Sequence, residues 1–203
     1  MAETTSGIRS KPQYTKLQHD PLSRWNLFIG EGDGLIGLIN LLNNSDTISS
    51  AATTFLYTGK DVEKAYAQAY FTTDRCSKVS RFEDKDALLA ALPNILEKSF
   101  MGLRLYISGS EAFLWKIHQL ASKHGMHKSE INMELNGSSA RQVYCPHCET
   151  LNEGVTTDIS ECNGCGLSLI NIDHFSREMG AYLGFRVDAE SPGTIPKKQE
   201  LYK

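Results

Sequence analysis

The residues of this chain best suited to chemistry are four cysteines arranged as two Cys-x-x-Cys pairs. Cys145 and Cys148 form the first pair, Cys162 and Cys165 form the second, and thirteen residues lie between the pairs. A two-residue spacer lets both thiolates of one tight turn point at one centre, and the longer connection can bring the second pair in from the opposite side. The spacing therefore predicts a tetrahedral four-thiolate site for zinc, or for a single iron as in rubredoxins.

The main alternative for these cysteines is a pair of disulfides, which would require an oxidising compartment. The N-terminus lacks the charged-then-apolar layout of a signal peptide, so we expect a cytoplasmic protein with reduced thiols. Pro146 should stiffen the first turn, and Gly164 and Gly166 allow positive φ angles in the second. His147 is expected to face solvent rather than bind the metal. We expect the fifth cysteine, Cys76, to be a buried apolar residue rather than a reactive thiol.

Composition narrows the class of protein. The chain has 203 residues, of which 40% are hydrophobic and 22% charged, and its formal net charge is −3. This fits one medium domain with a small appendage. A nucleic-acid-binding surface would show as clustered basic residues, and no apolar run approaches the length of a membrane span. We therefore expect neither nucleic acid nor a membrane as a partner.

Strand and helix signals alternate along the first two thirds of the chain. Strands are predicted at residues 25–29, 53–57, 77–82, 103–107 and 130–135, and helices at residues 35–42, 61–70, 86–96 and 111–125. Pro93 is expected to end or kink its helix early. The alternation predicts an α/β domain with a parallel sheet and helices on both faces, where ligands bind at the carboxyl ends of the strands.

A glycine-rich turn, residues 30–34, joins the first predicted strand to the first helix. This layout is typical of a nucleotide-binding βα turn, in which backbone amides at a helix N-terminus receive phosphate. Two acids, Glu31 and Asp33, would repel a phosphate, so a tight turn needed for packing remains the alternative. The candidate nucleotide-binding residues are Gly32, Gly34, Ser108 and Gly109.

Several stretches of residues 24–136 resemble the pyridine-nucleotide-binding half of ferredoxin reductases. These stretches are residues 32–37, 56–60, 105–114, 124–125 and 131–135. The resemblance implies a reductase-like fold, but Ser108-Gly109-Ser110 stands where that family has cysteine-glycine-proline. Ile36-Gly37 replaces its threonine-proline, and only about twenty residues precede the match where the family has a flavin-binding barrel. We therefore expect a retained scaffold, or a domain that shares a nucleotide with a partner, rather than independent hydride transfer.

The sequence divides into four parts. We expect a polar N-terminal arm at residues 1–22, the reductase-like α/β domain at residues 23–140, a four-cysteine zinc-ribbon or rubredoxin-like module at residues 141–172, and a docking segment with a tail at residues 173–203. The arm is either disordered or ordered by a partner. The module has predicted strands at residues 156–159 and 167–172, and it is so small that a structural zinc would supply most of its folding free energy, on the order of 10 kcal/mol. The aromatic residues Phe175, Tyr182 and Phe185 form a docking surface or pack onto their own domain.

The order of these parts, with the run from His174 to Asp188, resembles the small subunit of bacterial dimethylamine monooxygenase, most densely between Tyr144 and Glu190. The resemblance implies one component of a multisubunit enzyme that uses NADPH and oxygen to oxidise dimethylamine to methylamine and formaldehyde. It also implies that NADP, FMN, haem and iron–sulfur clusters belong to partner subunits, one containing haem and others forming a flavin and iron–sulfur reductase.

Three functions remain open for the chain itself. The first, which we favour, is an accessory subunit whose four cysteines hold structural zinc and whose role is assembly. The second is an electron-transfer subunit with a single iron in the same site. Rubredoxins usually carry glycine after each cysteine pair, whereas here Glu149 follows the first pair and Gly166 the second, which favours zinc. The third is an unrelated zinc-ribbon module that binds protein. In none of these is the chain expected to be catalytic alone.

Overall fold

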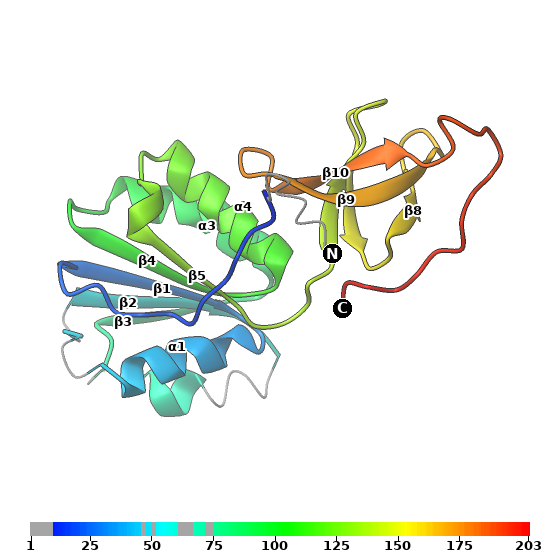
Figure 1. The fold of residues 1–203 in the computed structure, drawn as a ribbon. Coiled ribbons are helices and arrows are strands. Elements are labelled where there is room, and N and C mark those ends of the chain that lie inside the picture. Colours follow the sequence, from blue (N-terminus) through cyan, green and yellow to red (C-terminus); the bar gives the residue numbers. More distant parts are fainter. Residues whose placement is uncertain (1–9, 46–47, 50–51, 61–66, 72–74) are drawn as a thin grey trace, which may run out of the picture. The chain divides into compact units, whose positions relative to one another are not determined.

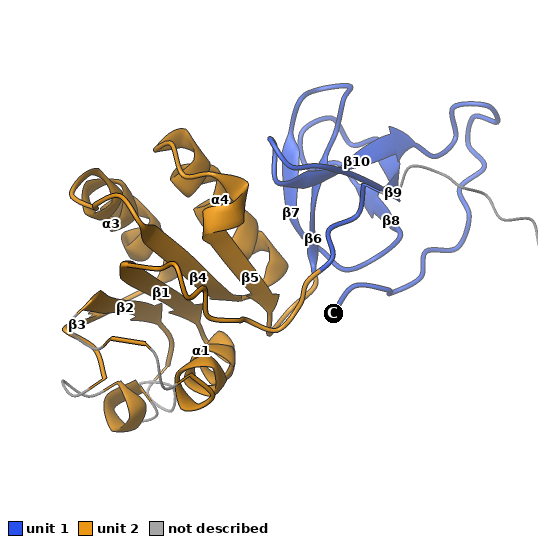
Figure 2. Cartoon of the chain, turned by 60° about the vertical axis from the view of Figure 1, so that its left-hand side comes forward, with its two compact units in different colours: residues 1–13, 140–203 blue, residues 14–139 orange. Residues whose placement is uncertain are grey.

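The computed structural model describes residues 10–45, 48–49, 52–60, 67–71 and 75–203. The chain forms two compact units, which Figure 2 shows in different colours. The first unit contains residues 14–139 and is labelled unit 2, orange, in Figure 2. The second unit contains residues 140–203 together with the N-terminal residues up to Gln13 and is labelled unit 1, blue. Each unit has its own five-stranded sheet, and they are described separately.

The first unit is a parallel sheet covered by helices on both faces. Its strands are β1 (Trp25–Glu31), β2 (Thr53–Thr58), β3 (Lys78–Phe82), β4 (Leu103–Gly109) and β5 (Ile131–Leu135), in the spatial order β3-β2-β1-β4-β5. Its helices are α1 (Gly34–Asn43), α3 (Lys85–Glu97), α4 (Glu111–Lys123) and the short 3₁₀ helix η2 (Lys128–Glu130). Helix α1 lies on one face, and α3 and α4 lie on the other (Figure 1). This confirms the predicted α/β class and its parallel sheet.

Side chains of the central strand β1 alternate between two cores, because successive residues of a strand point to opposite faces of the sheet. Leu27 and Ile29 belong to the core beneath α3 and α4, whereas Phe28 belongs to the core beneath α1. Phe28 packs edge-on against Tyr106 of β4, with ring centroids 5.1 Å apart. All three side chains are buried, because both faces of the sheet are covered. This explains why the middle of β1 is a continuous apolar run.

Two helix predictions need comment. Residues 61–66 of the helix predicted at 61–70 lie outside the described residues, and residues 67–70 are helical. The helix predicted at residues 86–96 is confirmed as α3, but the expected early end at Pro93 was wrong, since α3 continues through Pro93 to Glu97. Leu92 and Leu96 are both buried on either side of the proline. Their packing offsets the backbone hydrogen bond that a proline removes.

The second unit is a mixed sheet built around the cysteine pairs. Its strands are β6 (Arg141–Tyr144), β7 (Leu151–Val155), β8 (Ile159–Glu161), β9 (Ser168–Ser176) and β10 (Ala181–Arg186), in the order β7-β6-β10-β9-β8. Only the β6–β10 pair is parallel. The strand predicted at residues 156–159 was wrong, because β7 ends before it and β8 begins at its last residue. The strand predicted at residues 167–172 exists and is longer.

The aromatic run after the cysteines is part of this sheet. Phe175 on β9 and Tyr182 on β10 are buried, and their rings meet edge-on at 4.8 Å between centroids. Only Phe185 is substantially exposed, at 44%. For Phe175 and Tyr182 the structure therefore shows the packing alternative rather than a free docking surface.

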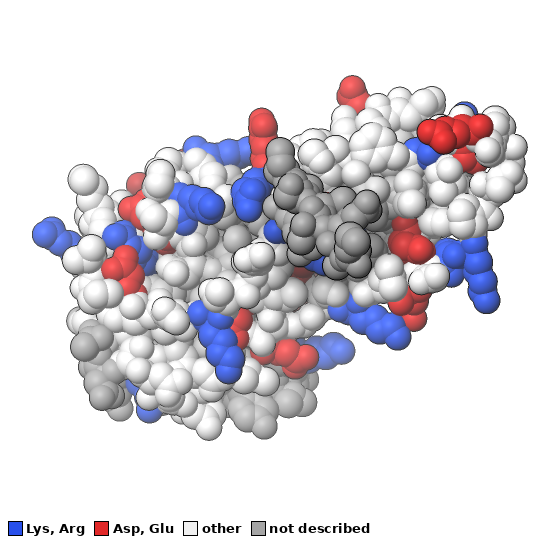
Figure 3. All heavy atoms as spheres, viewed as in Figure 1, with Lys and Arg blue, Asp and Glu red and all other residues white. Residues whose placement is uncertain are grey.

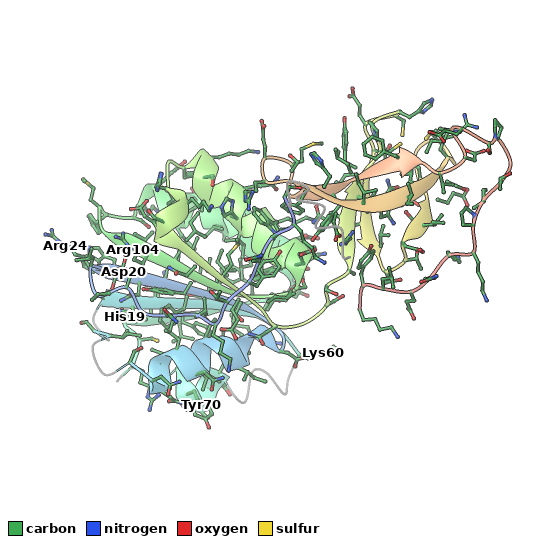
Figure 4. All side chains as sticks on the ribbon, viewed as in Figure 1. His19, Asp20, Arg24, Lys60, Tyr70 and Arg104 are labelled. Carbon is green, nitrogen blue, oxygen red and sulfur yellow. The ribbon has the colours of Figure 1, made fainter. Side chains whose placement is uncertain are left out.

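The described residues of the predicted N-terminal arm make polar contacts with strands and helices of the first unit. In the first unit, the Tyr14 hydroxyl donates to Glu111 Oε1 at 2.8 Å, and the Leu17 amide donates to Glu134 Oε2 at 2.8 Å. Asp20 forms an ion pair with Arg104 of β4 at the amino end of the sheet (Figure 4). The described part of the predicted polar arm is thus fixed by specific polar contacts.

On the face shown in Figure 3, basic and acidic side chains are interspersed, without a broad area of one sign. Within the described ranges, no helix is both long and apolar enough to cross a bilayer.

Candidate metal centre

The four predicted ligands come together at one point of the second unit. The sulfur atoms of Cys145, Cys148, Cys162 and Cys165 all lie within 4.8 Å of one another. The Cys145 and Cys165 sulfurs are 3.8 Å apart, and those of Cys148 and Cys162 are 3.5 Å apart. Four sulfurs around zinc at about 2.3 Å would be separated by roughly 3.8 Å, so the cluster fits one tetrahedral ion. These separations are far longer than a disulfide bond.

Two backbone turns with the same hydrogen-bond pattern present the sulfurs. In the first turn, the Cys145 amide donates to Thr150 O at 2.9 Å, and the Glu149 amide donates to Cys145 O at 2.8 Å. In the second turn, the Cys162 amide donates to Leu167 O and the Gly166 amide donates to Cys162 O, both at 2.9 Å. Each turn therefore fixes its pair of cysteines in the same way, and the two turns meet across the metal position.

The two turns are packed against each other closely enough to require a glycine. A Cβ atom on Gly164 would lie 2.1 Å from Thr150 Oγ1 and 3.0 Å from Cys148 Sγ. The same Thr150 hydroxyl lies 3.3 Å from the Cys148 sulfur, within hydrogen-bonding distance. The prediction that Gly164 needs a positive φ was wrong, because only Gly166 of the two glycines has one, at +72°. Gly164 is needed for lack of space instead. Thr150 orients one of the ligands.

A buried asparagine that the sequence did not single out supports the second pair. Asn152 on β7 is 1% exposed. Its side-chain oxygen accepts a hydrogen bond from the Asn163 amide at 2.8 Å, and its nitrogen lies 3.7 Å from Cys162 Sγ. The nitrogen also donates to Val143 O at 3.1 Å. In the sequence, Asn152 is marked only by its position four residues after the first Cys-x-x-Cys pair. Its supporting role could not be predicted from that position, because its partners Cys162 and Asn163 belong to the second turn.

The surroundings of the sulfurs shift the pKa values of Cys162 and Cys165 in opposite directions. Burial alone would raise the pKa of Cys162. Hydrogen bonds from the Cys165 and Gly164 amides, from Cys148 and from Asn152 outweigh burial and lower that pKa to about 6. At Cys165 the Leu167 amide favours the thiolate, but burial and the other three sulfurs outweigh it and raise the pKa to about 12. Hydrogen bonds from the Thr150 hydroxyl and amide also lower the pKa of Cys148. Hydrogen bonds thus favour the thiolate at two of the four cysteines, and four thiolates at these distances require a cation.

The candidate nucleotide-binding residues also meet at one place in the first unit. Strands β1 and β4 are neighbours, and the chain leaves them toward opposite sides of the sheet, so their carboxyl ends border the topological switch point. A Cβ on Gly34 would lie 2.1 Å from Ser108 O, and one on Gly109 would lie 2.8 Å from Phe113 Cδ1. Gly32 has φ +50° and open space around it. Close packing thus explains why positions 34 and 109 require glycine, and the positive φ explains why position 32 favours it.

Three groups that could bind a phosphate at this point, the Ser110 amide and the hydroxyls of Ser108 and Ser110, are already paired within the chain. Glu31 Oε2 accepts from the Ser110 amide at 3.1 Å and from the Ser110 hydroxyl at 2.5 Å, at the N-terminus of α4. Ser108 Oγ accepts from Asn136 Nδ2 at 3.0 Å. The carboxylate of Glu31 therefore occupies the anion-binding position that a helix N-terminus offers.

Comparison with known proteins places both units in one family. Residues 6–131 match the family model for the dimethylamine monooxygenase subunit DmmA-like N-terminal domain, and residues 142–185, which contain all four clustered cysteines, match the model for its C-terminal domain. The chain belongs to the DmmA-like family. The resemblance expected from the sequence is thereby confirmed, and the cysteine cluster lies within a segment that defines the DmmA-like C-terminal domain.

One curated relative of this DmmA-like chain is the heme-dependent oxidative N-demethylase delta subunit of Ectopseudomonas mendocina (strain ymp). The two sequences are 38% identical over 105 residues, which is 52% of this chain and 60% of the relative. The aligned part thus covers less than two thirds of that subunit.

Proposed function

We propose that this chain is a subunit of a multisubunit oxidative N-demethylase, in which it helps to assemble or orient the other subunits. Membership of the DmmA-like family and the likeness to a demethylase delta subunit support this role. The proposed reaction of the complex is the NADPH- and O2-dependent conversion of dimethylamine to methylamine and formaldehyde in the cytoplasm. The proposed partners are a haem-containing subunit and flavin and iron–sulfur reductase subunits, which would hold the redox cofactors.

The observation that carries the assembly role is the cysteine cluster with its two matching turns. The apolar cluster around the sulfurs is small, with Cys145 and Cys162 beside only three buried aliphatic side chains, Val143, Val155 and Leu169. Such a cluster contributes little apolar burial at the two turns, so a metal ion would add much of the free energy that holds them together. In this proposal Cys145, Cys148, Cys162 and Cys165 bind zinc. The zinc holds the second unit in a fixed shape for contact with partner subunits.

Neighbouring groups support the assignment of the first unit as a scaffold without its own nucleotide. The carboxylate of Glu31 lies at the α4 N-terminus, and Asp33 lies next to the same turn. A bound phosphate would have to displace the first group and approach the second. In this proposal, Gly32, Gly34, Ser108 and Gly109 maintain the turn, and NADP binds to a partner subunit.

A second candidate is a single-iron electron relay, and one feature of the first turn keeps it open. Glu149 adopts φ +60°, close to the φ of +72° at Gly166, so the missing glycine after the first pair changes the residue type without changing the turn. In addition, Cys148 and Cys165 are less buried than the other two cysteines of the cluster. A redox ion there would be close to the surface, as electron transfer between proteins needs.

Metal analysis of the purified full chain, together with its visible absorption spectrum, separates the two candidates. One zinc per chain and no visible absorption would support the structural site and exclude this subunit from the electron path. One iron with thiolate charge-transfer bands that bleach on reduction would support the relay. A chain that folds without any metal and assembles normally with the demethylase subunits would contradict both.

A further inference from the structure

The amino-terminal end of the parallel sheet carries an apolar pocket that neither proposed function uses. It lies between the last turn of α3 and the first residues of β1, β2 and β4, and its volume is about 350 Å³. Its main apolar lining comes from Trp25, Leu27, Leu56, Ile95, Phe100 and Leu103. The four-cysteine cluster belongs to the other unit, and the glycine turn lies at the opposite end of these strands.

The rim of this pocket is unusually apolar for a surface. Phe100 is 67% exposed and Met101 is 94% exposed, in the short connection between α3 and β4. Backbone hydrogen bonds hold this connection beside the start of β1, since the Arg24 and Trp25 amides both donate to Gly102 O, at 3.0 and 3.3 Å. The Trp25 and Phe100 rings lie 5.5 Å apart between centroids. Exposed aromatic pairs next to a preformed pocket are typical of binding sites for protein segments.

The charged side chains that line the pocket are all basic. Lys78 and Lys98 line it, and Arg24 lies beside it, with its side chain against Gly102 and pointing away from the end of the sheet in Figure 4. No acidic side chain is among the lining residues that the structure describes. None of these three cations has an ion-pair partner in the described part of the chain. They are therefore available to an acidic ligand, in a chain whose net charge is negative.

We propose that this surface binds an acidic segment of a partner protein, with one large aromatic or aliphatic side chain as its anchor. A pocket of about 350 Å³ is at the small end of ligand sites and suits one such side chain. Phe100 and Met101 would cover the anchor, and Arg24, Lys78 and Lys98 would attract the flanking carboxylates. Charge complementarity of this kind selects partners and raises the rate of association.

The test uses the full chain and a synthetic peptide, so it does not depend on the identity of the demethylase or its assembly. The probe is a peptide with a central phenylalanine flanked on each side by three acidic residues. Trp25 reports binding because it is 40% exposed, whereas the other tryptophan, Trp115, is 3% exposed. We expect a saturable change in tryptophan emission at low salt. Raising NaCl from about 0.05 to about 0.5 M should weaken binding at least tenfold, because salt screens exposed charges.

Matched variants locate the site. Phe100→Ser and Lys98→Glu should each weaken peptide binding about tenfold or more. Ile36→Ser removes an apolar side chain that is 58% exposed on α1, and Lys85→Glu reverses a charge at the other end of α3, so both should leave the affinity unchanged. All four changes lie at accessible positions, and circular dichroism checks that each variant folds.

Three results would overturn the proposal. The first is no saturable signal with the acidic peptide. The second is equal affinity for a peptide in which lysines replace the acidic residues, which would remove the charge argument. The third is a dimer in sedimentation experiments that Phe100→Ser dissociates, which would assign the surface to a second copy of the chain. Peptide binding with failed subunit assembly would leave this surface intact and count only against the demethylase role.

Discussion

Glu149 and Gly166 occupy equivalent positions in the two cysteine turns, although one is a bulky acid and the other is glycine. Their φ angles are +60° and +72°, and each donates its amide to the carbonyl of the first cysteine of its turn, at 2.8 and 2.9 Å. Glu149 is the one non-glycine residue with positive φ among the residues that the structure describes. A side chain in this left-handed region costs about 1–2 kcal/mol.

This relationship predicts that Glu149→Gly stabilises the second unit. We expect a gain of up to about 1 kcal/mol, because relief of the left-handed strain is partly offset by the greater freedom of glycine in the unfolded chain. The measurement is the free energy of unfolding of the metal-loaded protein in denaturant. Gly166→Ala is the matched change in the other turn and should destabilise by a similar amount. A less stable Glu149→Gly protein would mean that the Glu149 side chain makes a stabilising contact.

Replacement of a clustered cysteine should reduce metal binding, whereas replacement of the isolated Cys76 should not. Cys162→Ser should reduce bound metal to well below one ion per chain and unfold the second unit, because it removes one of four ligands and the residue that Asn152 supports. A chelator should do the same to the unmodified chain. Metal content and the far-ultraviolet circular dichroism of the β-sheet report both effects.

Cys76 is the control for this experiment. It is buried beneath α1, and burial raises the pKa of its thiol to about 11, so it stays protonated near neutral pH. Cys76→Ser should therefore leave the metal content at one ion per chain, whatever it does to the stability of the first unit. Equal metal loss in both variants would indicate a general folding defect rather than loss of a ligand.

The two glycines of the predicted nucleotide turn should respond differently to alanine. Gly34→Ala places a Cβ 2.1 Å from Ser108 O, so the α1 N-terminus must move away from β4, and we expect a loss of several kcal/mol. Gly32→Ala meets no atom within 4 Å and costs only the strain of φ +50°, about 1 kcal/mol. Thermal unfolding of the two variants measures the difference. Equal losses would show that the turn relaxes more easily than its packing indicates.

The carboxylate at the α4 N-terminus predicts that the isolated chain does not bind NADPH. Glu31 already accepts the Ser110 amide and hydroxyl, and its charge would repel an incoming phosphate. Isothermal titration of the full chain with NADPH should therefore show no saturable heat. If binding is observed and Gly32→Val abolishes it, the turn is a working nucleotide site and the scaffold assignment is wrong.

Local sequence patterns predicted the parts of the structure that depend on neighbouring residues. The Cys-x-x-Cys spacing located all four clustered sulfurs, and the β-branched and aromatic run at residues 53–57 located β2. Predictions failed where pairing with another segment of the chain decides the outcome. Strand β7 contains Asn152, Glu153 and Gly154, which disfavour strands, and its pairing with β6 overrides that preference. Similarly, nothing near Glu31 in the sequence indicates that its partner is Ser110, 79 residues away.

The last prediction concerns Arg141, a buried cation held by the C-terminal residues. Its guanidinium is 3.8 Å from the ring centroid of Tyr182 and 3.7 Å from that of Tyr202, and it pairs with Asp173. The amide of Tyr202 donates to Thr156 O at 2.9 Å, which fixes the second ring over the cation.

Tyr202→Ala would uncover one face of this guanidinium and remove a desolvated cation–π contact, so we expect the second unit to lose about 1–2 kcal/mol of stability. Tyr202→Phe keeps the ring and should lose little. Leu201→Ala, at a neighbouring side chain that is 55% exposed, should also have little effect. Chemical denaturation of the three variants makes the comparison. If Tyr202→Phe were as destabilising as Tyr202→Ala, the hydroxyl rather than the aromatic face would be the stabilising group, and the sandwich around Arg141 would contribute little.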